Sequence, residues 1–378
     1  MSISLFSKRP AKNAQTPPEI IASYTRIKEL GQGTWGVCYF GSSKENNELK
    51  SVRALSNSFS KKELSAVDSA VRLTSFVDSI RFQHAESLTL SANVPCLSSQ
   101  FVAGENLVRI VKRKGRLSVR QSIYCIARAI EGLDAAYKKS IVHGELRPSK
   151  IIIDSQGTVT IRDLAIAQVT RLRRQFNLSA HVLETPKQHV EYLAPEILVG
   201  GNASFSSDLY SLGCILFYLL TGKPPYPYKD LKRIVKAHQE AAIPQASRSV
   251  KDIPASLEVC LERMLAKQPI NRFANYKQCH DALRAVAKSL PKDEPLDQEQ
   301  WEQVVDVDQA VASDRWSSPS SIVSTRLVYT VGGLVLLAGV VVSAMFAFRT
   351  VKPTTGNAQS SDSREIQTTG SEDSFRLE

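Results

Sequence analysis

Residues 327–348 are the feature that most constrains this chain, because these 22 residues, LVYTVGGLVLLAGVVVSAMFAF, include no charged side chain. As a helix the run would be roughly 33 Å long, enough to cross a hydrocarbon core of about 30 Å. A helix buried in a globular core is the alternative, but it fits so long an apolar run less well. The sequence therefore predicts one transmembrane helix, and the other parts of the chain have to fold outside the lipid.

The position of this run predicts the topology. The N-terminus, MSISLFSKRPAKNAQTPPE, has basic residues without a following apolar run, so it does not resemble a secretory signal. The transmembrane run ends 30 residues before the C-terminus. The large N-terminal part is therefore expected on the cytoplasmic side of a single-pass membrane protein. The neighbouring charges do not decide the orientation, because Arg315 and Arg326 precede the run and Arg349, Lys352 and Arg364 follow it.

The net charge of +11 is unevenly distributed. Residues 1–291 contain 41 basic and 24 acidic side chains, a net charge of +17, whereas residues 292–314 contain one and eight, a net charge of −7. Outside one central domain and the transmembrane run, large apolar residues are scarce, which is typical of solvated segments. The predicted boundaries are a disordered arm at 1–23, one domain at 24–289, an acidic and Ser-rich linker at 290–326, the transmembrane helix at 327–348 and a short disordered tail at 349–378.

The six cysteines are scattered and form no CxxC pair. A disulfide framework is typically denser and belongs to a shorter, secreted chain. The sequence therefore predicts buried, reduced thiols in a reducing compartment, at Cys38, Cys96, Cys125, Cys214, Cys260 and Cys279.

The pattern of apolar residues changes along the central domain. Short strand-like runs separated by turns come first, and mostly helical periodicity follows. This order predicts a small β-rich lobe before a larger α-rich lobe. The strand-like runs are 24–30, 36–43 and 49–55, and the helical stretches include 61–83, 119–139 and 207–221.

Three glycines, Gly31, Gly33 and Gly36, stand between the first two strand-like runs. Glycines at this spacing allow backbone N–H groups to approach phosphates closely, although an ordinary glycine-rich hairpin has the same pattern. A strand rather than a helix follows, which disfavours a dinucleotide-binding turn and favours a glycine flap over ATP. The three glycines are therefore candidates for nucleotide binding.

Further motifs follow the glycines along the chain. They are VHGELRPSKIIID at 142–154, the segment at 159–167, YLAPE at 192–196, DLYSLG at 208–213 with TGKPPY at 221–226, and Asn271-Arg272. In this order they resemble the catalytic loop, DFG segment, APE motif, helix F region and late structural arginine of the protein Ser/Thr kinase family, most closely its bacterial membrane-anchored members. The resemblance implies an α+β, two-lobed protein-kinase-like fold, with a small β-rich N-lobe and a larger α-helical C-lobe, that uses ATP and Mg²⁺.

The departures from the family pattern concentrate where its chemistry is done. Arg53 stands at the position of the strand Lys that holds the α- and β-phosphates, so a planar fork replaces a compact ammonium. Counting nine residues back from His84 puts the helix-C Glu position at Ser75, which would remove the Lys–Glu ion pair of the active family. Glu145 stands at the catalytic base, and its extra methylene displaces the carboxylate by about an ångström, a shift that costs on the order of a hundredfold in rate.

The metal-binding positions also differ. Lys150 replaces the Asn that ligates the second Mg²⁺, and an ammonium repels a metal ion. Asp163 remains as the one candidate metal ligand, for a single Mg²⁺, while Leu164 and Ala165 replace the Phe and Gly that usually follow it. Arg147 keeps the cation of the usual Lys. The matched positions carry a net charge of +1, two units above the family pattern: Arg53, Ser75, Glu145, Arg147, Lys150 and Asp163.

A cleft with this charge is expected to attract a triphosphate while recruiting Mg²⁺ poorly. The leading interpretation is a pseudokinase that acts as a membrane-tethered signalling scaffold or allosteric regulator and binds ATP with little dependence on metal. One alternative is a weak or unconventional Ser/Thr kinase that uses Glu145 as its base and Asp163 for one metal ion. Another is a binding module whose cleft holds no nucleotide.

Other matched residues are architectural in the family. Asp208 implies a tie to the catalytic-loop backbone, and Glu196 implies an ion pair with Arg272. His143 matches a packed structural histidine rather than a general base. These residues predict that the fold is kept although the chemistry is altered.

Basic side chains gather at 109–120, 171–174 and 229–236. They indicate either a solvated basic face or attraction to anionic lipid headgroups, at about 1 kcal/mol for each residue near the surface. A third possibility is that the acidic stretch 292–314 covers these basic side chains. Nucleic acid is disfavoured because aromatic residues do not interleave with the basic ones. Protein partners are expected, but the sequence does not identify them.

Overall fold

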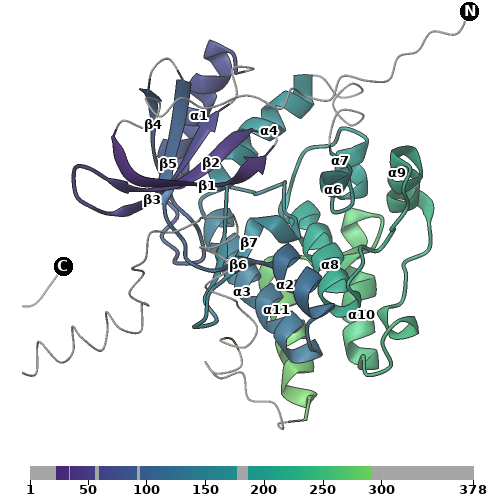
Figure 1. Cartoon of the computed structure of the whole chain (residues 1–378). Helices are drawn as coiled ribbons and strands as arrows, with labels where there is room; N and C mark the ends of the chain where they lie inside the picture. Colours follow the sequence, from purple (N-terminus) through teal and green to yellow (C-terminus); the bar gives the residue numbers. More distant parts are fainter. Residues whose placement is uncertain are drawn as a thin grey trace, which may run out of the picture. The chain divides into compact units, whose positions relative to one another are not determined.

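The computed structural model describes residues 23–33, 35–55, 59–91, 94–176, 186–291 and 301 (Figure 1). All of them belong to the first of two units, Met1–Arg315. Residues 1–22 of the predicted arm, most of the predicted linker, the predicted transmembrane helix and the tail lie outside the described residues. None of the helices in the described part of the chain is long and apolar enough to cross a membrane.

An antiparallel five-stranded sheet, in the spatial order β1-β2-β3-β5-β4, begins the fold. Its first three strands confirm the three predicted strand-like runs. The helix α1, Lys61–Thr74, begins at a capping box of Ser60 and Glu63 and ends well before the predicted residue 83. The strand bounds are Tyr24–Gly33 (β1), Gly36–Ser43 (β2), Leu49–Leu55 (β3), Ala85–Ser91 (β4) and Val94–Gln100 (β5).

The alternation of side chains along β3 determines on which face of the sheet Arg53 lies. Val52 and Ala54 pack with Tyr39 on one face of the sheet, and Leu55 packs on the other, toward α1. Because successive strand residues point to opposite faces, Arg53 shares the face of Leu55. The guanidinium of Arg53 therefore lies on the face of the sheet that packs against α1, which is called the inner face below.

A helical lobe follows, with a small antiparallel sheet in the order β6-β7-β8 (Figure 1). Its centre is α8, Phe205–Thr221, in which every residue from 206 to 220 is buried. A helix that is apolar on all sides is expected to lie inside a core. The other elements are β6 (Glu105–Asn106), α2 (Leu107–Lys114), α3 (Val119–Tyr137), η2 (Pro148–Lys150), β7 (Ile151–Ile153), β8 (Val159–Ile161), α4 (Leu164–Phe176), α6 (Lys187–Val190), α7 (Pro195–Leu198), α9 (Leu231–Glu240), η3 (Ala246–Arg248), α10 (Ala255–Met264), η4 (Pro269–Asn271) and α11 (Tyr276–Ser289).

The structure confirms the predicted order of a small β-rich lobe and a larger helical lobe. It also confirms that all six cysteines are free and buried. Trp301 differs from expectation, because it falls in the segment predicted to be a solvated linker. Its side chain is only 2% exposed and joins the apolar core of the helical lobe.

Candidate active site

Asp208 supports the loop that carries the candidate residues. Its carboxylate accepts hydrogen bonds from the backbone N–H groups of His143, at 2.9 Å, and Gly144, at 2.7 Å. The hydroxyl of Tyr276 also donates to it, at 3.0 Å. Asp208 lies in the first turn of α8, near the positive end of the helix dipole, which favours an ionised carboxylate there. The loop therefore rests on a buried, charged support, as the sequence predicted for Asp208.

His143 links this loop to the residue before Asp163. Its Nδ1 accepts from the N–H of Glu145 at 3.2 Å, so its Nε2 carries the proton and donates to the carbonyl of Arg162 at 3.1 Å. Burial lowers the pKa of His143 to about 3, which keeps the imidazole neutral. This geometry fits a structural histidine rather than a proton acceptor for a substrate.

Asp163 is held between two cations. The Nη2 of Arg53 lies 2.8 Å from one carboxylate oxygen, and the Nζ of Lys150 donates to the other. The backbone of Asp163 has φ +64°, a left-handed conformation that is uncommon outside glycine. Burial by itself would raise the pKa of Asp163, but Arg53 and Lys150 outweigh that effect and hold it well below its usual range. The carboxylate is therefore ionised and has a cation on each oxygen.

Lys150 is almost completely buried, with 7% of its side chain exposed. Burial lowers the pKa of Lys150 to about 7; Asp163 opposes this shift, and the cations of Arg147 and Arg53 reinforce it. The ammonium is thus charged below about pH 7 and becomes neutral above it.

Glu145 and Arg147 lie beside this pair. The Oε2 of Glu145 lies 3.5 Å from Nη1 of Arg147, and Glu145 is only 4% exposed. Burial lowers the pKa of Arg147 to about 10, so the guanidinium remains charged at neutral pH. The carboxylate at the position of the catalytic base is therefore turned inward beside a cation, rather than open to a substrate hydroxyl.

The three candidate glycines lie in the hairpin between β1 and β2. Gly33 pairs with Gly36, and Gly31 and Gly36 have φ values of +139° and +124°. A Cβ at Gly36 would lie 1.9 Å from the carbonyl oxygen of Ala54 on β3. Gly36 is therefore required for close packing of two strands, whatever its part in nucleotide binding.

The predicted ion pair between Glu196 and Arg272 connects α7 with the residue that follows η4 in the helical lobe. Arg272 contacts both carboxylate oxygens of Glu196, at 2.7 and 2.8 Å. It also donates to the carbonyls of Ser206, Ala266 and Lys267, at 2.9, 2.8 and 3.1 Å. The Arg272 side chain is completely buried, and its guanidinium lies over the ring of Tyr210.

Comparison with known proteins identifies the family, because residues 24–284 match the protein kinase domain. The chain belongs to the protein kinase family. It is similar to the serine/threonine-protein kinase PknB of Mycobacterium leprae, with 28% identity over 215 residues that make up 57% of this chain and 34% of that protein. It is also similar to a probable serine/threonine-protein kinase PknB of Lactococcus lactis, with 26% identity over 271 residues, 68% of this chain and 40% of that protein. The match thus covers less than half of the length of these relatives.

The helix-C position of this kinase domain was assigned incorrectly from the sequence. Ser75 is the C-cap of α1, is exposed and donates to the carbonyl of Arg72, so it does not face Arg53. The count from His84 failed because the helix ends at residue 74 and turns fill the interval before β4. Two acidic side chains of α1 act locally, since Glu63 caps the helix and Asp68 pairs with Arg72 at 2.6 Å. Arg53 pairs instead with Asp163.

A helix that sequence reasoning missed begins directly after Asp163. In α4, Ala165, Ile166 and Val169 are buried and pack with the apolar face of α1 in one core cluster. Figure 1 shows α4 beside α1 at the inner side of the sheet. Trp35, from the hairpin with the glycines, joins the same cluster. The apolar spacing at 165, 166 and 169 was the available sequence signal for this helix.

The protonation of Lys150 gives a testable pH dependence in this kinase domain. We expect ATP to bind more weakly as the pH rises through about 7, because the buried ammonium loses its proton there. At pH 8 the triphosphate should restore that proton, so binding should take up close to one proton more than in Lys150→Asn. Calorimetry in buffers with different ionisation enthalpies measures this uptake. Equal uptake by the wild type and Lys150→Asn would rule out a titrating Lys150.

Proposed function

We propose that this protein is a pseudokinase of the Ser/Thr kinase family that binds ATP through cationic side chains and regulates protein partners as a membrane-tethered scaffold. The observation that carries the proposal is the ion pair between Lys150 and Asp163. In the family pattern these two positions hold metal ions. Here one of them is an ammonium, and it neutralises the other.

The residues fit a polyphosphate well. Arg53 and Lys150 contact the ionised carboxylate of Asp163, and Arg147 lies beside the carboxylate of Glu145. Burial strengthens the attraction of these cations for phosphate oxygens. Arg53 offers a planar fork suited to two oxygens, and Lys150 offers a point charge. These three cations would hold the phosphates by charge-assisted hydrogen bonds. The adenine-binding surface is expected against the inner face of the five-stranded sheet.

The residues fit Mg²⁺ less well. This ion requires near-octahedral oxygen ligands at about 2.1 Å and releases its waters reluctantly. Both oxygens of Asp163 already contact cations, and Lys150 stands where the family pattern has the Asn that ligates the second Mg²⁺. Metal binding at Asp163 would have to displace Arg53 or Lys150. The proposed domain therefore depends little on Mg²⁺ for nucleotide binding.

An active Ser/Thr kinase is the second candidate, and the relatives named as such kinases favour it. In this function Glu145 would accept the proton of a substrate hydroxyl, and Asp163 would hold one Mg²⁺ that neutralises charge on the phosphates. The inward position of Glu145, beside Arg147, would have to change before a hydroxyl could reach it.

Phosphate transfer distinguishes the two functions. With labelled ATP, Mg²⁺ and a mixed protein substrate, we expect transfer by the wild-type chain to equal that of Asp163→Ala. Thermal shifts with ATP should still show binding by the wild type. Transfer that is abolished by both Asp163→Ala and Glu145→Gln would establish an enzyme and overturn the pseudokinase proposal. Absence of any nucleotide shift would instead support a module that binds no nucleotide.

A further inference from the structure

One end of the helical lobe carries a group of exposed cations that the nucleotide cleft does not use. The last turn of α2 and the residues after it read KRKGR, at 112–116. Residues 106–130 include seven basic side chains and no acidic one. Lys112, Lys114 and Arg116 are exposed. A concentration of one sign of charge on a surface attracts polyanions.

Packing between two helix ends brings a fourth cation to this group. The N–H of Leu117 donates to the carbonyl of Leu219, near the end of α8, at 2.8 Å. Gly115 and Gly222 are the C-caps of α2 and α8, and a Cβ at Gly222 would lie only 2.4 Å from the carbonyl oxygen of Gly115. Lys223 follows directly and is exposed. The four side chains that meet here are called the basic end: Lys112, Lys114, Arg116 and Lys223.

The charges of the basic end are not neutralised within the described part of the chain. Arg113, the neighbouring cation, pairs with Glu105 at 2.5 Å, but no ion pair joins the four side chains of the basic end to a described acidic residue. The helix dipole favours cations at the end of α2, which accounts for their place on that helix. It leaves their charged groups in solvent, with a formal sum of +4.

The form of the basic end suits a broad anionic surface rather than a small ligand. Three of its side chains are lysines, which carry compact charges on flexible stems. None of the four is held by a side-chain hydrogen bond within the described residues. A site for one small anion requires donors fixed in a matching geometry, whereas many lipid headgroups attract cations without such a geometry.

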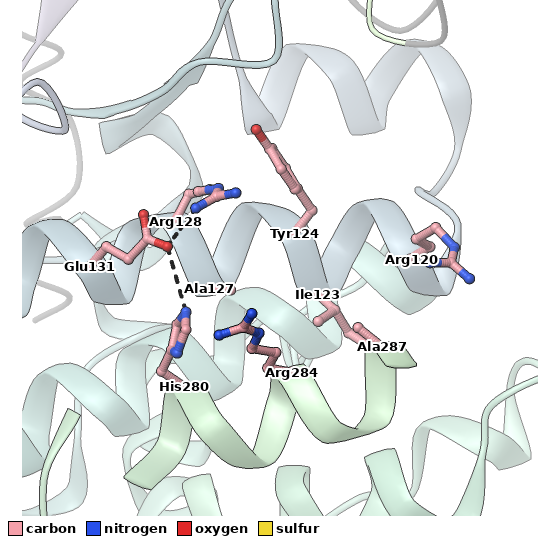
Figure 2. Close-up of a pocket in the computed structure, with 9 residues that line it drawn as sticks. All are labelled: Arg120, Ile123, Tyr124, Ala127, Arg128, Glu131, His280, Arg284 and Ala287. Carbon is pink, nitrogen blue, oxygen red and sulfur yellow. Dashed lines mark hydrogen bonds and ion pairs between the residues drawn. The ribbon is translucent and has the colours of Figure 1, made fainter. Parts of the chain in front are cut away.

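The chain leaves α11 near the basic end, because α3 and α11 run antiparallel. Glu131, toward the end of α3, lies 3.5 Å from Nε2 of His280, toward the start of α11. Arg120, at the start of α3, donates to the carbonyl of Pro291, just after α11, at 2.5 Å. Figure 2 shows Arg120 and Ala287 at one end of this helix pair and Glu131 with His280 farther along it. Only four residues separate Arg120 from the last residue of the KRKGR run.

Trp301 keeps the chain at the same end of α3. The rings of Trp301 and Tyr124 have centroids 5.3 Å apart, and Tyr124 lies about one helical turn after Arg120. The predicted transmembrane run starts at residue 327, so 25 residues separate it from Trp301. These residues span at most roughly 90 Å when extended. A membrane entered by that run would therefore lie within reach of the basic end.

We propose that the basic end binds the anionic headgroups of the membrane to which the chain is tethered. This inference rests on the membrane tether of the proposed function. Each cation near an anionic surface favours the attached state by about fivefold, which is equivalent to about 1 kcal/mol. Asp208, under the candidate active site, and Gly222 are about 20 Å apart along α8. Attachment at the end of α8 thus leaves the nucleotide cleft on the side away from the lipid.

Lysine acetylation in the full chain tests this attachment. The chain is incorporated into nanodiscs of neutral phosphatidylcholine or of an equal mixture with anionic phosphatidylglycerol. Mass spectrometry then gives the rate at which an uncharged reagent modifies each lysine. We expect Lys112, Lys114 and Lys223 to react at least about fivefold more slowly on the anionic nanodiscs, and high salt to remove the difference. Lys138 and Lys139, exposed at the other end of α3, should react equally on both.

Two double variants provide a matched comparison, since each removes two exposed lysine charges. Lys112→Gln with Lys114→Gln should abolish the protection of Lys223 on anionic nanodiscs. Lys138→Gln with Lys139→Gln should leave that protection unchanged. Equal thermal midpoints of the two variants confirm that both are folded. Equal loss of Lys223 protection in both variants would overturn the proposal.

The nanodiscs also separate the lipid contact from the tether. Equal reaction of the basic-end lysines on both kinds of nanodisc, with the chain incorporated in both, would overturn the lipid contact while the tether stands. A chain that fails to join neutral nanodiscs would contradict the tether. Protection on anionic nanodiscs would then still support the lipid contact, and its absence would overturn it. Protection of the same lysines by soluble polyglutamate, but not by anionic nanodiscs, would likewise overturn it and indicate an acidic protein partner.

Discussion

Replacing Arg272 with alanine should lower the free energy of unfolding by about 3–5 kcal/mol, because it removes a completely buried cation and leaves the half-buried carboxylate of Glu196 without its partner. The substitution removes both bonds to Glu196 and the donors to three backbone carbonyls. It also leaves a cavity beside Tyr210, over whose ring the guanidinium lies. Denaturant unfolding followed by circular dichroism measures the loss, provided that the slope of the transition stays the same.

Lys277→Ala provides the comparison, because Lys277 makes an exposed ion pair with Asp281 on α11. Exposed pairs of this kind contribute about 0–1 kcal/mol, so this variant should unfold almost as the wild type does. The contrast separates a buried pair with full hydrogen bonding from a solvated one. A loss below about 1 kcal/mol for Arg272→Ala would mean that the helical lobe does not depend on this contact.

Replacing Asp163 with asparagine should increase the affinity for ATP in the absence of metal by about tenfold or more, since each 1.4 kcal/mol is a factor of ten. The carboxylate neutralises Arg53 and Lys150 and repels the phosphates that these cations would bind. At an effective dielectric constant of 20, two charges 4 Å apart interact by about 4 kcal/mol. Removal of even part of this repulsion between Asp163 and the phosphates is enough to account for a tenfold gain in affinity. Calorimetric titration with ATP in EDTA measures it.

The same substitution has the opposite consequence in a kinase that binds ATP through metal. There the aspartate holds the ion that bridges the phosphates, and its loss weakens binding. Asp281→Asn, at an exposed position of α11, controls for the loss of one negative charge from the surface. A lower ATP affinity of Asp163→Asn in EDTA would contradict the cationic site.

The residues predicted best from sequence were those with fixed places in an ordered set of motifs. Asp208 contacts the loop at His143 and Gly144 across more than sixty residues of chain, and Arg272 reaches Glu196 across 76. Local periodicity contains no information on such distant pairs. The likeness to a family supplied it, because the spacing of motifs carries the tertiary arrangement with it. The three strand-like runs could be predicted from the local pattern of apolar residues and from the turns between the runs.

The features that sequence reasoning missed depend on packing between distant segments. The assignment of Ser75 to the helix-C Glu position depended on a constant interval before His84. In the structure, α1 ends where its buried face ends, at Thr74. The helix α4 forms because its apolar side chains pack against the apolar face of α1 within the fold. Trp301 looked solvated because its neighbours are acidic, and its seat at Tyr124 and Gly157 lies more than 140 residues away in the chain.

The ion pairs around Asp163 are an intermediate case. Each of Arg53, Lys150 and Asp163 was a candidate residue, and the excess of positive charge was predicted. Their pairing was not, because β3 and the segment after β8 meet only in the folded domain. The pairing changes the chemistry of the site, because both oxygens of the Asp163 carboxylate already contact cations of the chain before a ligand binds.

Calorimetric titration of the wild-type chain with ATP, once in EDTA and once in excess Mg²⁺, tests the central claim most directly. If Arg53, Arg147 and Lys150 hold the triphosphate, the two dissociation constants should agree within about fivefold, a difference below about 1 kcal/mol. Lys150→Asn, which removes the ammonium and supplies an amide ligand, should weaken binding in EDTA and make it more dependent on Mg²⁺. Tight binding of ATP by the wild type only when Mg²⁺ is present would contradict the account.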